Sequence, residues 1–205
     1  MEKLLIMNKL NSYILAGFSL FSLLCGGCLM PESTHVEPDY FLLSDFFLDQ
    51  NDSTVKRDCS FYLREIELPR YLKDTRMIFR PSEHTITFRE SKRWGEPLED
   101  GLSRVLSLNL HSLLNFTNYS IFPNRRKEGL LWDLSISFSA FEKVDDIVLI
   151  DSKWFAKDKK NSSLSGSFKH EIILPNDADE FEEIEAFNKA LAFLAKNIAD
   201  QLIAQ

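Results

Sequence analysis

The first 27 residues determine how much of this 205-residue chain is left to form a folded domain. Lys3 and Lys9 precede an uncharged, mainly apolar stretch at 13–24, which is followed closely by two glycines. The stretch has about a dozen residues, whereas a membrane-spanning helix needs roughly 20. A basic start, a short apolar stretch and small residues at the cleavage point are typical of a secretory signal peptide. We therefore expect residues 1–27 to be removed, which leaves 205 − 27 = 178 residues.

The end of this segment indicates what kind of signal it is. Bacterial lipoprotein signals end in a lipobox, in which an aliphatic residue and two small residues precede the cysteine that receives the lipid. Gly26 and Gly27 fit the small positions and Cys28 fits the acceptor, while Cys25 stands where leucine is usual. The alternative is an ordinary signal peptide followed by a chance cysteine. We predict that Cys28 is lipidated, because the several acyl chains of such an anchor attach a protein stably to a membrane.

The residues after the predicted lipidation site indicate its destination and the start of the domain. Leu29 follows the cysteine where an aspartate would favour retention in the inner membrane. We therefore expect an outer-membrane protein that faces the periplasm. Residues 31–39 are polar, with a proline near each end, and residues 28–39 are predicted to be the lipidated N-terminus and a tether. The folded domain is expected over 40–205.

Composition limits the class of protein. A net charge of −7 argues against a nucleic-acid partner, which requires a clustered basic surface. Hydrophobic residues make up 44% of the chain, which is enough for one core in a domain of this length. Cys59 is the one cysteine left after the signal and the anchor, so no internal disulfide is expected. We interpret Cys59 as a small buried hydrophobic residue, with a reactive or intermolecular role as the alternative.

Hydrophobic periodicity predicts eight strands and two long helices. Residues alternate between apolar and polar over 132–141, which is typical of a strand with one buried face. The predicted strands lie at 40–43, 61–68, 77–80, 85–90, 117–122, 132–141, 147–155 and 164–174. The third and fourth of these, 77–80 and 85–90, flank residues 81–84, which suit a four-residue hairpin loop.

The two predicted helices carry apolar residues at three- and four-residue steps. One spans about 98–115, and the other begins near residue 180, where Asp177 or Asp179 can cap it. Together, the predicted strands and helices indicate an α/β protein: a single three-layer domain with a mixed, largely antiparallel sheet and two main helices.

Catalytic and metal-binding patterns are missing from the sequence. The histidines, His35, His84, His111 and His170, are too far apart for a familiar metal site. The sequence has no nucleophile elbow, no phosphate-binding loop and no dinucleotide fingerprint. The acidic pairs at 145–146 and 182–183 are interpreted as solvated charges. We predict no metal, no cofactor and no enzymatic activity; a hydrolase with an unrecognised site is the alternative.

Two short segments are more distinctive than a core requires. Residues 69–72 read Pro-Arg-Tyr-Leu and lead to a strand that ends at Arg80, and residues 93–98 read Arg-Trp-Gly-Glu-Pro-Leu. Here the sequence resembles the transport-auxiliary lipoproteins typified by the lipoprotein of the paraquat-inducible operon. The resemblance extends from Tyr40 to the last helix, and its second half matches in layout more than in letters.

The resemblance implies both a fold and a function. It implies a layered α/β domain akin to anticodon-binding domains, on an outer-membrane lipoprotein without catalytic residues. The implied partners are MCE-type lipid-carrying proteins and ABC transporter components, so the implied role is docking in intermembrane lipid transport. Self-association stays open. The alternative is an envelope scaffold or assembly lipoprotein without lipid cargo.

The motif residues divide into structural and contact candidates. Tyr71, Leu72 and Arg93 are candidate partner contacts, because tyrosine and arginine often anchor interfaces. For Tyr71 and Arg93 a purely structural role is an equal alternative. The structural candidates are Pro69, Arg80, Trp94, Pro97 and Leu98. Among these, we expect Trp94, Pro97 and Leu98 to fasten the first helix to the sheet.

Overall fold

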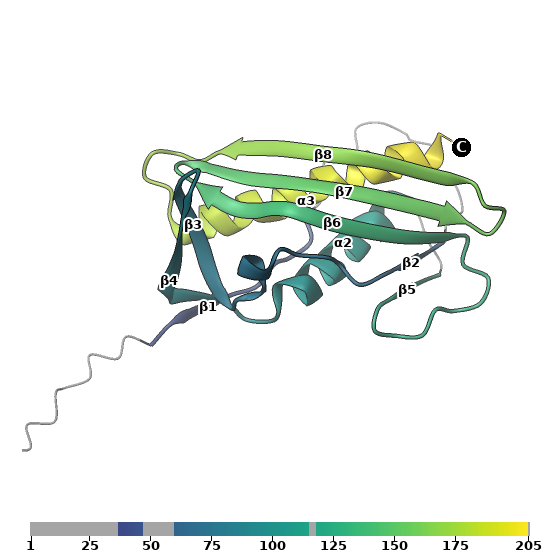
Figure 1. Ribbon diagram of the computed structural model, residues 1–205, viewed down its shortest axis with the longest axis horizontal. Coiled ribbons are helices and arrows are strands. Elements are labelled where there is room, and N and C mark those ends of the chain that lie inside the picture. The colour runs from purple at the N-terminus through teal and green to yellow at the C-terminus, as the bar shows by residue number, and fades with distance from the viewer. Residues whose placement is uncertain (1–36, 47–59, 115–117, 205) are drawn as a thin grey trace, which may run out of the picture. The chain divides into compact units, whose positions relative to one another are not determined.

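The computed structural model describes residues 37–46, 60–114 and 118–204, and Figure 1 shows their arrangement. All of them belong to one compact unit, Glu37–Gln205. The predicted signal peptide, the lipidation site Cys28 and the role of Cys59 lie outside the described residues. The predicted tether is described only from Glu37, and its last residue, Asp39, already belongs to a strand.

The described residues contain eight strands in one mixed sheet. The strands are β1 (Asp39–Phe41), β2 (Phe61–Leu63), β3 (Arg76–Ser82), β4 (Thr85–Trp94), β5 (Tyr119–Ile121), β6 (Trp132–Val144), β7 (Ile147–Asp158) and β8 (Ser163–Ile173). One path through the sheet runs β1-β4-β3-β6-β2-β5, and β7 and β8 continue from the other edge of β6. The strands β6, β7 and β8 form the antiparallel meander that the sequence predicts.

β6 is the central strand, because both of its edges are paired. β7 runs antiparallel to β6 over its whole length. On the opposite edge, β2 runs parallel to its first residues and β3 runs parallel to its last two. Between β2 and β3 the chain stays close to β6 through an isolated bridge from Glu67 to Ser137. These parallel pairings join segments that are far apart in the sequence.

Two boundaries differ from those that periodicity predicts. The strand expected over 61–68 ends at Leu63, because the chain then loses its register with β6. Leu63 pairs with Leu134 and Glu67 pairs with Ser137, so four steps along the chain match three steps along β6. The hairpin loop expected over 81–84 is shorter, since β3 continues to Ser82 and β4 begins at Thr85. The hydroxyl groups of Ser82 and Thr85 lie 2.6 Å apart and close this turn.

The two predicted helices are α2 (Leu98–Leu114) and α3 (Glu180–Ile203), and a short 3-10 turn, η1 (Arg70–Lys73), precedes β3. Asp179 is the residue that caps α3. Its carboxylate accepts the Glu182 N–H at 2.9 Å, and the Glu182 carboxylate accepts the Asp179 N–H at 2.9 Å. This reciprocal pair is a capping box, which satisfies N–H groups that a helix start leaves open.

Both helices cover the same face of the sheet. The Phe141 ring on β6 lies 4.7 Å from the Phe187 ring on α3, measured between centroids. On α2, His111 packs against Tyr119 of β5, and Tyr119 stacks on Phe61 of β2. The α/β class, the single domain, the mixed sheet and the two principal helices are therefore confirmed. The helices form one layer, because α2 and α3 pack against each other.

Trp154 connects β7 to both β8 and α3. Trp154 on β7 is 2% exposed, and its indole N–H donates to the Asn197 side-chain oxygen on α3 at 3.3 Å. Gly166, on β8, pairs with Trp154 across the two strands. A Cβ atom at this position would come within 2.8 Å of the indole. The other face of β8 carries serines and charged residues.

No helix in the described part of the chain is long and apolar enough to cross a bilayer.

Candidate docking site

The first motif builds a turn beside β6. Pro69 precedes η1, and its carbonyl accepts the Leu72 N–H at 3.0 Å. Leu72, predicted as a candidate partner contact, is 2% exposed and belongs to the core, so it has no surface to offer a partner. Tyr71 is half-buried, and its hydroxyl donates to the Ser139 carbonyl at 3.2 Å.

A buried ion pair holds this turn in place. The Arg80 Nε donates to one Glu142 oxygen at 2.6 Å, and its Nη2 donates to the other at 3.3 Å. Glu142 is 2% exposed, and the Arg80 guanidinium also lies over the Tyr71 ring at 5.7 Å. Burial and the Glu142 charge raise the pKa of Tyr71. The cluster joins η1, β3 and β6.

The second motif connects β4 to α2. Trp94 is 7% exposed, and its ring lies 5.7 Å from Phe187 and 6.4 Å from Phe141. The Pro97 carbonyl accepts two N–H groups from the first turn of α2, at 3.0 and 3.1 Å. Leu98, the first residue of α2, is 3% exposed. These contacts place all three residues where a structural role requires them.

Arg93 has different surroundings. It lies opposite Tyr40 on β1 and opposite Arg76 on β3. Among the described residues, no ion pair includes Arg93. Its Nε atom is buried and has no hydrogen-bond partner there. Arg93 attracts Asp74 only weakly, since the hydrogen bond from Arg76 is the main cause that lowers the pKa of Asp74 to about 2.

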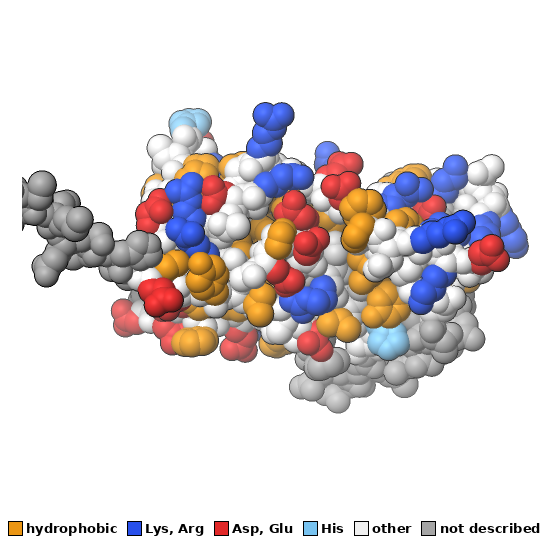
Figure 2. All heavy atoms as spheres, turned by 90° about the horizontal axis from the view of Figure 1, so that it is seen from below, with side chains coloured by type: hydrophobic (Ala, Val, Ile, Leu, Met, Phe, Trp, Pro, Cys, Tyr) orange, Lys and Arg blue, Asp and Glu red, His pale blue; other side chains and the backbone are white. Residues whose placement is uncertain are grey.

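An apolar groove of about 540 Å³ lies between β1, with the residues that follow it, and the first turns of α3. Tyr40, Leu42 and Phe181 line it and are 63%, 56% and 76% exposed. Figure 2 shows hydrophobic side chains gathered among acidic ones at the end of the surface that carries β1. The groove falls within the 300–1,000 Å³ range of ordinary ligand sites.

The buried side-chain amide of Asn188 connects the two sides of this groove. The Asn188 side-chain oxygen on α3 accepts the Ser44 N–H at 2.9 Å, and its amide donates to the Ser44 hydroxyl at 3.0 Å. The Phe41 ring meets the Phe181 ring edge-on, with centroids 6.4 Å apart. The segment after β1 is thus tied to α3.

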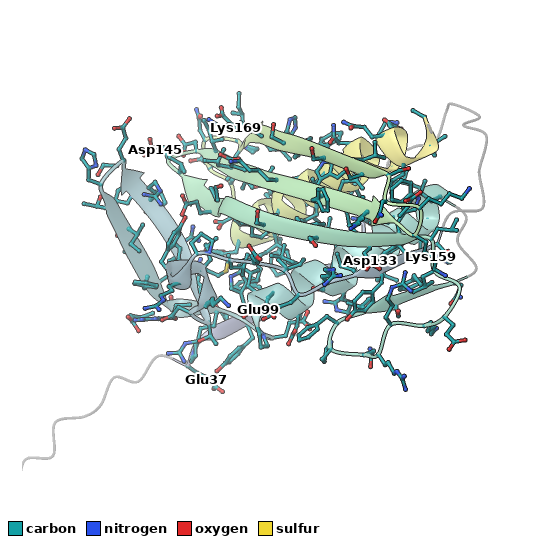
Figure 3. All side chains as sticks on the ribbon, turned by 45° about the vertical axis from the view of Figure 1, so that its right-hand side comes forward. Glu37, Glu99, Asp133, Asp145, Lys159 and Lys169 are labelled. Atoms are coloured by element: carbon teal, nitrogen blue, oxygen red, sulfur yellow. The ribbon has the colours of Figure 1, made fainter. Side chains whose placement is uncertain are left out.

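Acidic residues occur in the groove and close to it in sequence. Glu185 lines the groove, Asp45 lies between the lining residues Ser44 and Phe46, and Glu37, labelled in Figure 3, lies two residues before the start of β1. None of these three carboxylates forms an ion pair with any residue in the described ranges. Lys92 is nearby on β4, where it pairs with Glu180, and burial lowers its pKa.

One acidic residue contradicts the interpretation of 182–183 as solvated charge. Glu183 is 3% exposed, and the Arg89 guanidinium donates to its Oε2 at 2.9 Å. Lys143 lies 3.8 Å from the same oxygen, and Oε1 has no partner in the described part of the chain. The prediction was wrong for Glu183 because its cationic partners come from β4 and β6, which sequence spacing does not reveal.

The groups with shifted pKa values do not gather in a cavity. They are Tyr71, Asp74, Arg76, Arg80 and Lys92. None of them lines the groove, nor the smaller cavity of about 130 Å³ on the helix-free face between Ser137 and Lys153. Acid–base chemistry usually requires such groups to converge in a pocket.

Sequence reasoning missed the groove. It placed Tyr40 and Leu42 in a strand without marking them as exposed, and it began the apolar stripe of α3 after Phe181. One signal was available: Phe181 stands between Glu180 and Glu182, in an otherwise acidic first turn. An apolar residue there has no core to enter.

Comparison with solved structures supports the fold. The chain is similar to an uncharacterized protein of known crystal structure, with 17% identity, a TM-score of 0.67, and coverage of 81% of this chain and 99% of that one. It is also similar to protein XCC0632 from Xanthomonas campestris, of the DUF330 family, with 12% identity, a TM-score of 0.60, and coverage of 82% and 94%. A search of curated proteins finds no match.

The described residues form an α/β domain whose surface carries an open apolar groove. A family model described as "ABC-type transport auxiliary lipoprotein component" matches residues 42–199. The chain belongs to this family. Membership makes it a membrane-anchored envelope lipoprotein associated with ABC-type transport, and it confirms the family that the two motifs indicated.

Proposed function

We propose that this protein is a lipid-anchored, non-catalytic subunit of an intermembrane lipid transport system. It sits on the periplasmic side of the outer membrane through Cys28 and docks an MCE-type lipid-carrying protein. The observation that carries this proposal is the family match over residues 42–199, which spans almost the whole described domain. The apolar groove supplies a surface through which docking can occur.

The arrangement of charges supports docking over catalysis. Glu142 and Glu183, the most deeply buried carboxylates, are 2% and 3% exposed and are paired with arginines. Each of these two carboxylates is engaged by a cation of the protein, and removing either partner would leave a buried charge uncompensated. The groove, by contrast, is apolar and open, as expected of a binding surface.

Photo-crosslinking in intact cells tests this proposal. A photoreactive phenylalanine replaces Phe181 in the groove, and a matched control replaces Phe155, which is 44% exposed on the helix-free face. Mass spectrometry then identifies the crosslinked proteins. An MCE-type protein or an ABC transporter component among them supports the proposal. Crosslinks only to cell-wall or assembly proteins, from both positions, would instead support the envelope scaffold.

Lipidation is tested separately with Cys28→Ala. We expect this variant to lose labelling by radioactive palmitate and to keep an unprocessed signal peptide, because the lipid acceptor is absent. Labelling that persists would show that the anchor is elsewhere.

A further inference from the structure

We propose that the groove beside β1 binds an extended peptide segment of a partner protein as an additional strand of the sheet. The segment would carry alternating apolar and basic side chains. This deepens the docking role and rests on it for the identity of the partner protein. Strand addition at a sheet edge beside a groove is a recurrent mode of peptide recognition.

The backbone of β1 has an open edge. β1 ends the strand order of the sheet and pairs only with β4 among the described strands. The Phe41 carbonyl accepts the Gly95 N–H at 2.8 Å, so Phe41 directs its backbone polar groups toward β4. Consecutive residues of a strand direct these groups to opposite edges. The N–H and carbonyl of Tyr40 therefore point away from β4, where an added strand would meet them.

The groove is lined partly by residues of this edge strand and of the segment that follows it. Tyr40 and Leu42 border it on the β1 side, and Phe181 and Ile184 border it on the helix side. A strand that pairs with Tyr40 would run between β1 and α3, and every second side chain would enter the apolar groove. β1 has three residues and follows Pro38, so pairing is restricted to a short segment. Selectivity must then come from the groove.

The site is also formed in advance. Asn188 holds Ser44 through two hydrogen bonds and is itself 6% exposed. A ligand therefore does not have to order the groove when it binds, and this reduces the entropic penalty of association.

Charge specifies the rest of the ligand. Glu185 lines the groove, and Glu37 and Asp45 lie within three residues of lining residues on the β1 side; none of the three forms an ion pair in the described part of the chain. A segment with lysine or arginine between its apolar residues would complement them, and binding should weaken as salt rises. Two other strands, β5 and β8, also end the sheet. β8 carries the exposed charges Lys169 and Glu171, and such charges discourage strand addition.

The test measures peptide binding to the full-length lipoprotein in detergent by fluorescence polarisation. The probe is a labelled peptide of alternating valine and lysine, and the matched peptide has glutamate in place of lysine. Tyr40→Pro removes the outward N–H, whereas Tyr40→Ala removes the ring and keeps that N–H. Neither change affects the bond between Phe41 and Gly95. Phe155→Ala is the control.

We expect saturable binding of the lysine peptide and weaker binding of the glutamate peptide. One backbone hydrogen bond corresponds to about a fivefold change in Kd, so Tyr40→Pro should bind about fivefold more weakly than Tyr40→Ala. Glu185→Lys, which leaves the backbone unchanged, should also weaken binding. Equal affinity for Tyr40→Pro and Tyr40→Ala, or no preference between the peptides, would overturn the proposal.

The result separates this inference from the transport role. If an MCE-type protein crosslinks only through Phe155, the docking function stands and the groove is not its site. If the groove binds the lysine peptide but no transport protein crosslinks in cells, the peptide site stands and the transport role fails.

Discussion

Gly166 on β8 lies against Trp154 on β7, and a Gly166→Ala substitution tests how tightly the sheet packs beneath α3. A methyl group would lie 2.8 Å from two indole atoms. The ring has little freedom to move, because Trp154 is 2% exposed and its N–H is bonded to Asn197. Overpacking of this kind costs about 1–3 kcal/mol, and the displaced hydrogen bond adds about 1 kcal/mol. Removing a glycine from a strand returns up to about 1 kcal/mol.

The expected net loss of stability is therefore about 1–3 kcal/mol. For a domain of this size it corresponds to a Tm lower by roughly 3–10 °C, which thermal unfolding followed by circular dichroism measures. Ser165→Ala, on the exposed face of the same strand, is the matched control and should change stability by less than about 0.5 kcal/mol. Trp154→Phe supplies a smaller ring and should recover at least about 1 kcal/mol of the penalty in a double-mutant cycle.

The reasoning would be refuted by a Gly166→Ala protein as stable as the wild type. It would also be refuted if Trp154→Phe and Gly166→Ala were simply additive, since the clash would then involve other atoms than those of the indole.

Three further predictions concern the charged groups. Glu142→Ala leaves the Arg80 cation beside a buried cavity and should destabilise the fold by about 3 kcal/mol in urea unfolding; a double replacement of Arg80 and Glu142 by leucines should recover most of this loss. The pKa of Asp74 is lowered from 3.8 to about 2 by hydrogen bonds from Arg76, so its stabilising contribution is present above pH 4 and lost as pH falls toward 2. Asp74→Asn should consequently show a shallower decrease of Tm over that interval, whereas an unchanged slope would refute this assignment. Asp179→Ala removes the cap of α3 and should cost about 1 kcal/mol in thermal unfolding; no measurable loss would mean that another group caps the helix.

Local patterns predicted the elements well. The alternation along 132–141 identified β6, because a strand with one buried face must alternate. The stripe after residue 180 identified α3 for the equivalent reason at a helical period. Both signals arise from neighbours in sequence, which is why they are visible without a structure.

The groove and the burial of Glu183 depend on neighbours that are distant in sequence. β1 pairs with β4 at Asp39 and Lys92, which are 92 − 39 = 53 residues apart, and Ser44 reaches Asn188 across 144 residues. No periodic pattern encodes such pairings. The sequence also does not reveal where the side chains of the motif at 69–72 lie. Leu72 enters the core and the Tyr71 hydroxyl donates to the Ser139 carbonyl, and both positions depend on the packing around β6.

The position of β1 has a consequence for how the domain folds and opens. β6, β7 and β8 are joined by short turns, so their contacts close small loops and are expected to form early. The pairing of β1 with β4 closes a much longer loop and involves three residues at the end of the sheet. It should form last and open first. The amides of β1 are therefore expected to exchange hydrogen faster than those of β7, so the groove borders the strand of the sheet that opens first.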